Sequence, residues 1–262
     1  MNPSARMPVA FFGHGSPMNT LQSNRHTEAW RALGAALPRP RAILSVSAHW
    51  YTDGAAVTAM QEPATIHDFF GFPQALFDLR YPAPGDPALA VRVRDLLAPL
   101  EVGMDQQWGL DHGTWSVLVH LYPQADIPVV QLAIDARQPA AWHYELGRRL
   151  APLRDEGVLI LGSGDVVHNL RLMRRGANPA PFDWAGRFNA QVRAYIETGE
   201  HAPLIAYQTL GEDAALSIPT PEHYLPLLYV LGAQAADDKV EFVTDGIELG
   251  SISMLTCTIG RQ

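Results

Sequence analysis

Short apolar runs alternate with amphipathic segments along most of the chain. Apolar runs of about four to eight residues between turn formers are typical of buried strands, and apolar residues three and four apart are typical of helices. We therefore expect strands at Met7–Phe12, Arg41–Val46, Ala56–Met60, Ile127–Ile134, Val158–Leu161, Val240–Thr244 and Ser251–Ile259. We expect helices at Thr27–Leu37, Pro87–Leu97, Thr114–Tyr122, Pro139–Asp155, Asp183–Thr198 and from Thr220 onwards.

Capping residues mark several helix ends and support this assignment. Asp86 followed by Pro87 is a typical helix start, and Asp183 is expected to cap the helix that follows it. Alternation of strands and helices predicts an α/β fold with a mainly parallel central sheet flanked by helices. The last two strands are close enough in the sequence to form antiparallel edge strands. Because neither a linker nor a repeat interrupts the pattern, we expect one domain, residues 1–262.

Composition excludes several classes of function. Hydrophobic residues make up 47% of the chain and charged residues 18%, which is ordinary for a globular protein. The net charge is −8 and no basic patch is present, so we expect no nucleic-acid partner. No apolar run approaches the roughly 18 residues of a membrane helix. The single cysteine, Cys257, lies in an expected strand and is interpreted as a core residue. These features favour the cytoplasm, and they leave the oligomeric state open.

Five of the ten histidines are predicted to meet at one edge of the sheet. Strand carboxyl ends and helix amino ends share one edge of a parallel α/β sheet, and ligands bind there. His14, His49 and His168 each follow an expected strand, His112 lies in a loop that enters a helix, and His223 falls in the first turn of the helix from Thr220. We expect four of the other histidines to be helix or surface residues: His26, His120, His143 and His201. His67 lies in an aromatic loop that either lines a substrate pocket or packs on the sheet edge.

Histidines in such a cluster suit Zn²⁺ or non-haem Fe²⁺ with an open coordination position. The helix dipole disfavours protonation of His223 near a helix start, and a metal needs neutral imidazole. Glu222 adjoins His223, so either residue can supply a ligand, although neighbouring helix residues point about 100° apart. We expect Asp111 and Asp165 either to orient histidine rings or to be ordinary loop aspartates.

Five motifs together resemble the class III extradiol ring-cleavage dioxygenases, most closely the 4,5-DOPA extradiol dioxygenase branch. They are Gly13-His14-Gly15-Ser16-Pro17, Ser47-Ala48-His49-Trp50, Gly109-Leu110-Asp111-His112-Gly113, Val167-His168-Asn169-Leu170 and Thr220-Pro221-Glu222-His223-Tyr224. The resemblance extends from about Pro8 to Gly260. Each motif is weak by itself, but five in this order are specific.

The resemblance implies one divalent metal, with Fe²⁺ for activity or Zn²⁺ as bound. It implies His14, His49 and His223 as ligands, His168 as a further ligand or the acid/base, and His112 as a residue on the substrate or oxygen side. The wider class uses a glutamate as third ligand, which leaves open whether Glu222 replaces His223.

The implied reaction is extradiol cleavage by O₂ of a catechol, L-DOPA or a related compound. For the proton transfers we select His168, with His112 stabilising the oxygen intermediate. The loop Phe69-Phe70-Gly71-Phe72 is a candidate cover for the substrate ring. Two alternatives stay open: a zinc hydrolase that uses a metal-bound water, and a non-enzymatic binding protein of the same fold.

Overall fold

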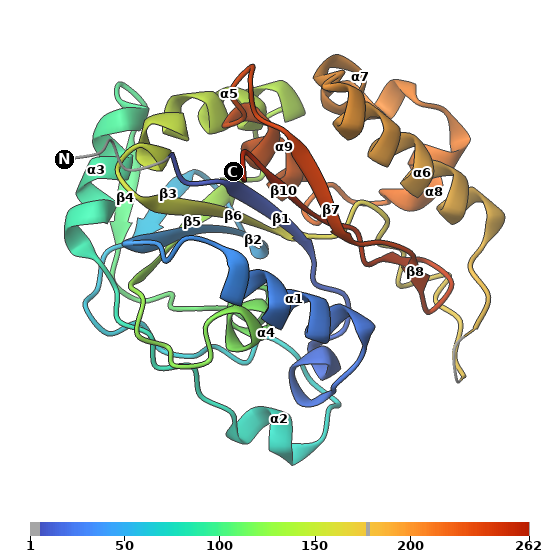
Figure 1. Cartoon of the computed structure of the whole chain (residues 1–262), viewed down its shortest axis with the longest axis horizontal. Helices are drawn as coiled ribbons and strands as arrows, with labels where there is room; N and C mark the ends of the chain where they lie inside the picture. Colours follow the sequence, from blue (N-terminus) through green and yellow to red (C-terminus); the bar gives the residue numbers. More distant parts are fainter. Residues whose placement is uncertain (1–5, 177–178, 262) are drawn as a thin grey trace.

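One eight-stranded sheet organises the protein, whose computed structural model describes residues 6–176 and 179–261 (Figure 1). The strand order is β4-β3-β5-β2-β6-β1-β10-β7. The strands are β1 (Val9–Gly13), β2 (Ala42–Thr52), β3 (Ala55–Thr58), β4 (Val102–Asp105), β5 (Val129–Asp135), β6 (Val158–Gly164), β7 (Val240–Thr244) and β10 (Thr256–Ile259). A separate small hairpin joins β8 (Ile247–Glu248) to β9 (Ile252–Ser253).

The four central strands β5, β2, β6 and β1 are parallel, as the alternating sequence pattern predicts. β10 pairs antiparallel with β1 and with β7, which confirms the expected antiparallel edge. At the other side β3 runs antiparallel to β5 and parallel to β4. The α/β fold with a mainly parallel sheet and antiparallel strands towards its edge is therefore confirmed.

Helices cover both faces of the sheet (Figure 1). They are α1 (Arg25–Ala36), α2 (Gln74–Asp78), α3 (Pro87–Leu97), α4 (His112–Leu121), α5 (Ala140–Leu150), α6 (Asp183–Thr198), α7 (His201–Ile205), α8 (Glu212–Ser217) and α9 (Leu225–Gly232). α1 and α4 pack on one face, and α3, α5 and α9 pack on the other. No helix in the described ranges is both long enough and apolar enough to cross a membrane.

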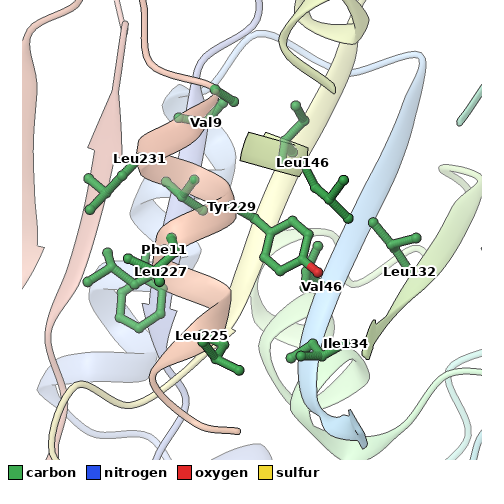
Figure 2. Packing of buried hydrophobic residues seen from close by; sticks show 14 of the residues in the cluster. Val9, Phe11, Val46, Leu132, Ile134, Leu146, Leu225, Leu227, Tyr229 and Leu231 are labelled. Carbon is green, nitrogen blue, oxygen red and sulfur yellow. The ribbon is translucent and has the colours of Figure 1, made fainter. Parts of the chain in front are cut away.

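Side chains of β1 alternate between the two faces, as the twofold repeat of a strand requires. Val9 and Phe11 join the core beneath α9, whereas Ala10 and Phe12 join the core beneath α1 and α4. All four are fully buried, so both halves of the core hold this strand in place. Figure 2 shows the α9 side, where side chains of that helix lie over β1 and β2. This packing fixes the carboxyl end of β1, where the first histidine lies.

Several local expectations were wrong in their boundaries. β2 continues through His49 to Thr52, so His49 lies within a strand and not after one. α4 begins at His112 with Asp111 as its N-cap, which moves the helix start two residues earlier than expected. The residues 221–224 form a turn, and the helix begins only at Leu225, because Pro226 occupies its first turn. His223 is therefore not a helix residue.

Further differences concern strands and helix ends. The segment expected as one strand, Ser251–Ile259, forms β9 and β10, which belong to separate sheets. β4 escaped prediction because it is short, contains a glycine and is only partly buried. α6 starts at Asp183, but its N-cap is Phe182 and no side chain caps it. α5 ends at Leu150 and a short 3₁₀ helix, Ala151–Arg154, completes the segment expected as one helix. Cys257 is buried in β10 as expected.

Candidate metal centre

The carboxyl ends of β1, β2 and β6 bring three histidines to one edge of the sheet. His14 directly follows β1, and His168 lies four residues after β6 ends at Gly164. The pairing of β2 with β6 ends at Ser47 and Ser163, and β2 then runs on beyond it. His49 therefore lies past the end of the β2–β6 pairing. The sheet itself creates the convergence that the sequence predicts.

All five predicted histidines meet there. Ring centroids of His14 and His49 lie 5.1 Å apart, and each lies within 5.4 Å of the ring of His223. The ring of His112 is 3.8 Å from that of His49. The ring of His168 stacks on His223 at 3.5 Å, with 7° between their planes. His223 thus links the pair from β1 and β2 to the segment after β6.

Ser163 determines which nitrogen of His14 carries the proton. The Ser163 hydroxyl donates its only proton to the carbonyl oxygen of Gly113 at 2.5 Å. Its oxygen also lies 3.0 Å from Nδ1 of His14, so it must accept a hydrogen bond from an Nδ1–H group. A neutral His14 then has its lone pair on Nε2. That nitrogen faces the other histidines and is ready to bind a metal.

Asp68 has the same effect on His49. Its Oδ2 lies 3.2 Å from Nδ1 of His49, and a carboxylate at that distance repels a lone pair and so favours a proton on Nδ1. The lone pair of His49 is then on Nε2, which lies 3.3 Å from Nε2 of His14. Two nitrogens bound tetrahedrally to one zinc ion at about 2.0–2.1 Å would lie about 3.3–3.4 Å apart. The two lone pairs therefore face each other at a spacing that suits a shared cation.

The protein disfavours a proton in place of that cation. Burial, followed by the neighbouring histidines, lowers the pKa of His14 well below its usual value. Burial, followed by His112, lowers the pKa of His49 to about 3, although Asp68 opposes the shift. Both rings are neutral at pH 7. Neutral imidazoles whose lone pairs meet are suited to binding a divalent metal.

Asp165 offers a second indication of a cation. The side chain is buried, and Oδ1 accepts a hydrogen bond from the backbone of Gly15 at 3.1 Å. Its other oxygen, Oδ2, has no hydrogen-bond partner and lies 3.6 Å from Nε2 of His14. Burial raises the pKa of Asp165 well above its usual value. A buried carboxyl oxygen without a partner is costly, and a metal ion nearby would offset that cost.

The ligand atoms form overlapping close sets. His14 belongs to one set with His49 and His112, and to a second with Asp165 and His223. A third set combines His168, Glu222 and His223. The donors are the nitrogen and carboxylate ligands that zinc and non-haem iron accept. The residues present therefore fit a single divalent metal at this edge.

His223 lies beside Glu222 in the turn before α9. Its Nδ1 is 3.2 Å from Oε1 of Glu222, which also accepts a hydrogen bond from Thr220 at 2.7 Å. Burial, followed by His168 and His49, lowers the pKa of His223 well below normal. Burial also lowers the pKa of His168 to about 4, so this ring too is neutral at pH 7.

His112 is held by the loop that we expected to cover the substrate. Its backbone N–H donates to Oδ1 of Asp68 at 2.9 Å, and its Nδ1 lies 2.9 Å from the same oxygen. The ring of Phe69 meets it edge to face at 5.4 Å. Phe70, by contrast, is 91% exposed. Only part of the expected aromatic cover thus packs against the histidine cluster.

Two glycines permit the close approach of these segments. A Cβ on Gly113 would lie 2.4 Å from the Ser47 hydroxyl, and one on Gly164 would lie 2.1 Å from the carbonyl oxygen of His223. Real Cβ atoms do not approach so closely, so a larger residue at either position would push α4 or the 221–224 turn away. The histidine cluster therefore depends on both glycines.

Asp111 does not orient a histidine ring, in contrast to one of the two roles we considered. Its carboxylate accepts hydrogen bonds from Ser47, from the backbone N–H of Thr114 and from Gln131. It therefore caps α4 and ties that helix to β2 and β5. Two residues that do contact the rings, Asp68 and Ser163, were not singled out from the sequence. An acid next to His67 in a long loop, and a serine between two glycines at a strand end, were the available signals.

The other five histidines lie outside the cluster. His26 lies 3.1 Å from Glu248, and His120 contacts the backbone of Asn19. His143 contacts the hydroxyl of Tyr229, and His201 contacts Tyr144. His67 contacts the backbone of Leu79 and packs among aromatic rings, so its loop position serves packing.

Comparisons with known proteins agree with this geometry. Residues 10–257 match the family model "Catalytic LigB subunit of aromatic ring-opening dioxygenase". The chain is 56% identical over 261 residues to a 4,5-DOPA dioxygenase extradiol of Escherichia coli (strain K12), covering 98% of this chain and 96% of the relative. It is 39% identical over 255 residues to a protein of the same name from Beta vulgaris, covering 93% and 92%. A crystal structure of an uncharacterized protein from Escherichia coli K12 superposes with a TM-score of 0.86 at 50% identity, covering 97% of this chain and 100% of that one.

Proposed function

Because the chain belongs to the LigB family of aromatic ring-opening dioxygenases and is a ring-cleaving extradiol dioxygenase, we propose that its substrate is L-DOPA or a related catechol. For L-DOPA the reaction is 4,5-cleavage by O₂ to 4,5-seco-DOPA. The relatives named as DOPA dioxygenases support this choice of substrate. Family membership decides against the two alternatives, the zinc hydrolase and the non-enzymatic binding protein.

We propose His14, His49 and His223 as the ligands of one divalent metal, which is Fe²⁺ in the active enzyme. The observation that carries this proposal is the 3.3 Å approach of Nε2 of His14 to Nε2 of His49, with both Nδ1 atoms engaged elsewhere. A bound Fe²⁺ would supply open positions for the catechol oxygens and O₂, and a path for electrons between them. Zn²⁺ suits the same nitrogen donors.

His168 is proposed as the acid/base that accepts a catechol proton and later returns it. The ring is neutral at pH 7, because burial holds its pKa at about 4, so it can accept a proton. Among the described residues, His168 shares a close set of ligand atoms with His223 and Glu222 but none with His14, which supports a position beside the metal. Its stacking on His223 would keep it beside the substrate position.

His112 and Phe69 are proposed to form the substrate side of the centre. Both lie against Asp68, which holds the backbone of His112 at the start of α4. Phe69 places an aromatic edge on the His112 ring and would exclude water from the bound catechol. His112 then has a polar nitrogen available to stabilise charge that develops on oxygen.

The proposal is tested by measuring O₂ uptake after anaerobic loading with Fe²⁺. We expect uptake to depend on a catechol, with the highest kcat/KM for L-DOPA among L-DOPA, dopamine, protocatechuate and unsubstituted catechol. Mass spectrometry with labelled oxygen should find both atoms in the ring-opened product. Iron-loaded protein that consumes no O₂ with any of these catechols would refute the proposed activity. A different best catechol would refute only the proposed substrate.

A further inference from the structure

Asp68 contacts two of the clustered histidines, although it belongs to neither of their elements. It lies in the aromatic loop, residues 66–73, which has no helix or strand of its own. Oδ2 lies 3.2 Å from Nδ1 of His49 on β2, and Oδ1 accepts the backbone N–H of His112 on α4 at 2.9 Å. Only 17% of the Asp68 side chain is exposed. One carboxylate thus joins β2 and α4 through a loop.

One oxygen of this carboxylate accepts a hydrogen bond, and the other lies against a histidine ring. The His112 backbone can only donate, so Oδ1 must accept. A carboxylate oxygen 3.2 Å from Nδ1 of His49 repels a lone pair on that nitrogen, so Oδ2 favours a proton there. The two contacts use different oxygens, so one side chain faces β2 and α4 at once.

We propose that Asp68 is a positioning residue that fixes the Nδ1–H tautomer of His49 and the orientation of His112. In this role it aims Nε2 of His49 at the metal and connects the metal centre to the aromatic loop. The part that concerns metal binding rests on the proposed function, in which His49 is a ligand. The part that concerns the tautomer does not depend on it.

The consequence is that loop position and metal binding are linked. Phe69, the next residue, packs against His112 and against the rings of Phe72 and Trp115. A displacement of the loop would move the carboxylate away from both histidines at once. Residues that orient metal-bound histidines typically change metal affinity by about 10–100-fold when they are replaced.

Asp68→Asn tests the acceptor role of the carboxylate, because asparagine keeps the size and shape of the side chain but replaces one acceptor oxygen. Asparagine has one acceptor oxygen and one donor NH₂ group, so it cannot accept from both His49 and His112. If the NH₂ group faces Nδ1 of His49, it donates to that nitrogen and favours the tautomer with the proton on Nε2. Nε2 then has no lone pair with which to bind a metal. Asp78→Asn is the matched control, because it removes the same charge from helix α2, where the carboxylate contacts Gln74.

The first measurement is the ring tautomer in the metal-free, full-length protein, read from ¹⁵N chemical shifts and long-range ¹H–¹⁵N correlations of His49. We expect the proton on Nδ1 in the wild type and in Asp78→Asn, and its loss from that position in Asp68→Asn. The second measurement is the affinity for Zn²⁺ by competition with a chromophoric chelator. We expect Asp68→Asn to bind Zn²⁺ about 10–100-fold more weakly than either reference protein.

A wild-type His49 with its proton on Nε2 would overturn the proposal, and so would Asp68→Asn that binds Zn²⁺ within twofold of the wild type. If Asp68→Asn does not fold, the wild-type tautomer alone decides. Neither measurement uses a catechol or O₂, so failure of the dioxygenase assay leaves both results interpretable. Conversely, if the enzyme is active but Asp68→Asn binds Zn²⁺ as tightly as the wild type, only this inference is overturned and the proposed function stands.

Discussion

Ser163→Ala removes a hydroxyl that serves two buried partners at the histidine cluster. Ser163 is fully buried in β6, donates to the carbonyl oxygen of Gly113 and accepts from Nδ1 of His14. Alanine fits the space but can do neither. His14 would then lose the acceptor that keeps its proton on Nδ1. The change is therefore expected to act on the fold and on metal binding together.

The magnitude follows from the two groups that lose their partner. A buried polar group left without a hydrogen bond costs about 1–3 kcal/mol, so the carbonyl and the Nδ1–H together cost about 2–6 kcal/mol. The variant no longer buries a hydroxyl, which offsets part of that loss. We expect the free energy of unfolding of the metal-free protein to fall by about 2–4 kcal/mol. Loss of the partner that orients His14 should also weaken metal binding about 10–100-fold.

Ser45→Ala is the matched control on the neighbouring strand. Ser45 is equally buried, and its hydroxyl lies 2.8 Å from that of Thr114, with no hydrogen bond to a histidine ring in the described part of the chain. It should lose about 1–3 kcal/mol of stability and keep its metal affinity. Urea unfolding of the metal-free proteins measures the first quantity, and chelator competition for Zn²⁺ measures the second. Equal Zn²⁺ affinity in Ser163→Ala and Ser45→Ala would refute the argument that Ser163 sets the His14 tautomer.

Further predictions concern the ligands, the acid/base and pH. Alanine in place of His14, His49 or His223 should abolish metal binding while the metal-free fold persists. A variant that still binds one metal ion per chain would exclude that residue as a ligand. Glu222→Gln should retain the metal, and metal loss would make Glu222 the third ligand. His168→Gln should keep iron and catechol binding but lose about 10²–10⁴-fold in turnover, whereas an unchanged rate would mark a bystander. Burial lowers the pKa of His143 to about 4 in the fold, so its contribution to stability is complete above pH 6.5 and is lost as pH falls towards 4. That contribution should fall by roughly 2 kcal/mol between pH 7 and pH 5, and urea unfolding of His143→Gln should lack that part of the pH dependence.

The sequence was most informative where periodicity and chain direction act together. Apolar runs located the central strands, and the rule that strand carboxyl ends share an edge placed His14, His49 and His168 near one another. The structure confirms that meeting, and the expected positions of His112 and His223 at the same edge are confirmed too. Their division into ligands and acid/base stays a prediction, because neither the strand pattern nor the fold contains the metal that would distinguish them.

Contacts between segments distant in sequence could not be read from the chain. Asp68 lies in a loop without periodicity, and its partners His49 and His112 depend on how that loop folds back over β2 and α4. The role of Ser163 at His14 depends on its hydrogen bond to the carbonyl oxygen of Gly113, which is 50 residues away in the sequence. Helix propensity also misled at residues 221–224, where packing of the turn against Gly164 outweighs the signal of a proline-started helix.

The place of β1 between β6 and β10 has a consequence for how the protein is made. β1 leaves the ribosome first among the strands and β10 last, yet the two are hydrogen-bonded neighbours. During synthesis the β10 side of β1 stays unpaired, so the strand that precedes His14 cannot complete its pairing until residues 256–259 have emerged. A nascent chain stalled before β10 would therefore expose an unpaired strand edge to chaperones.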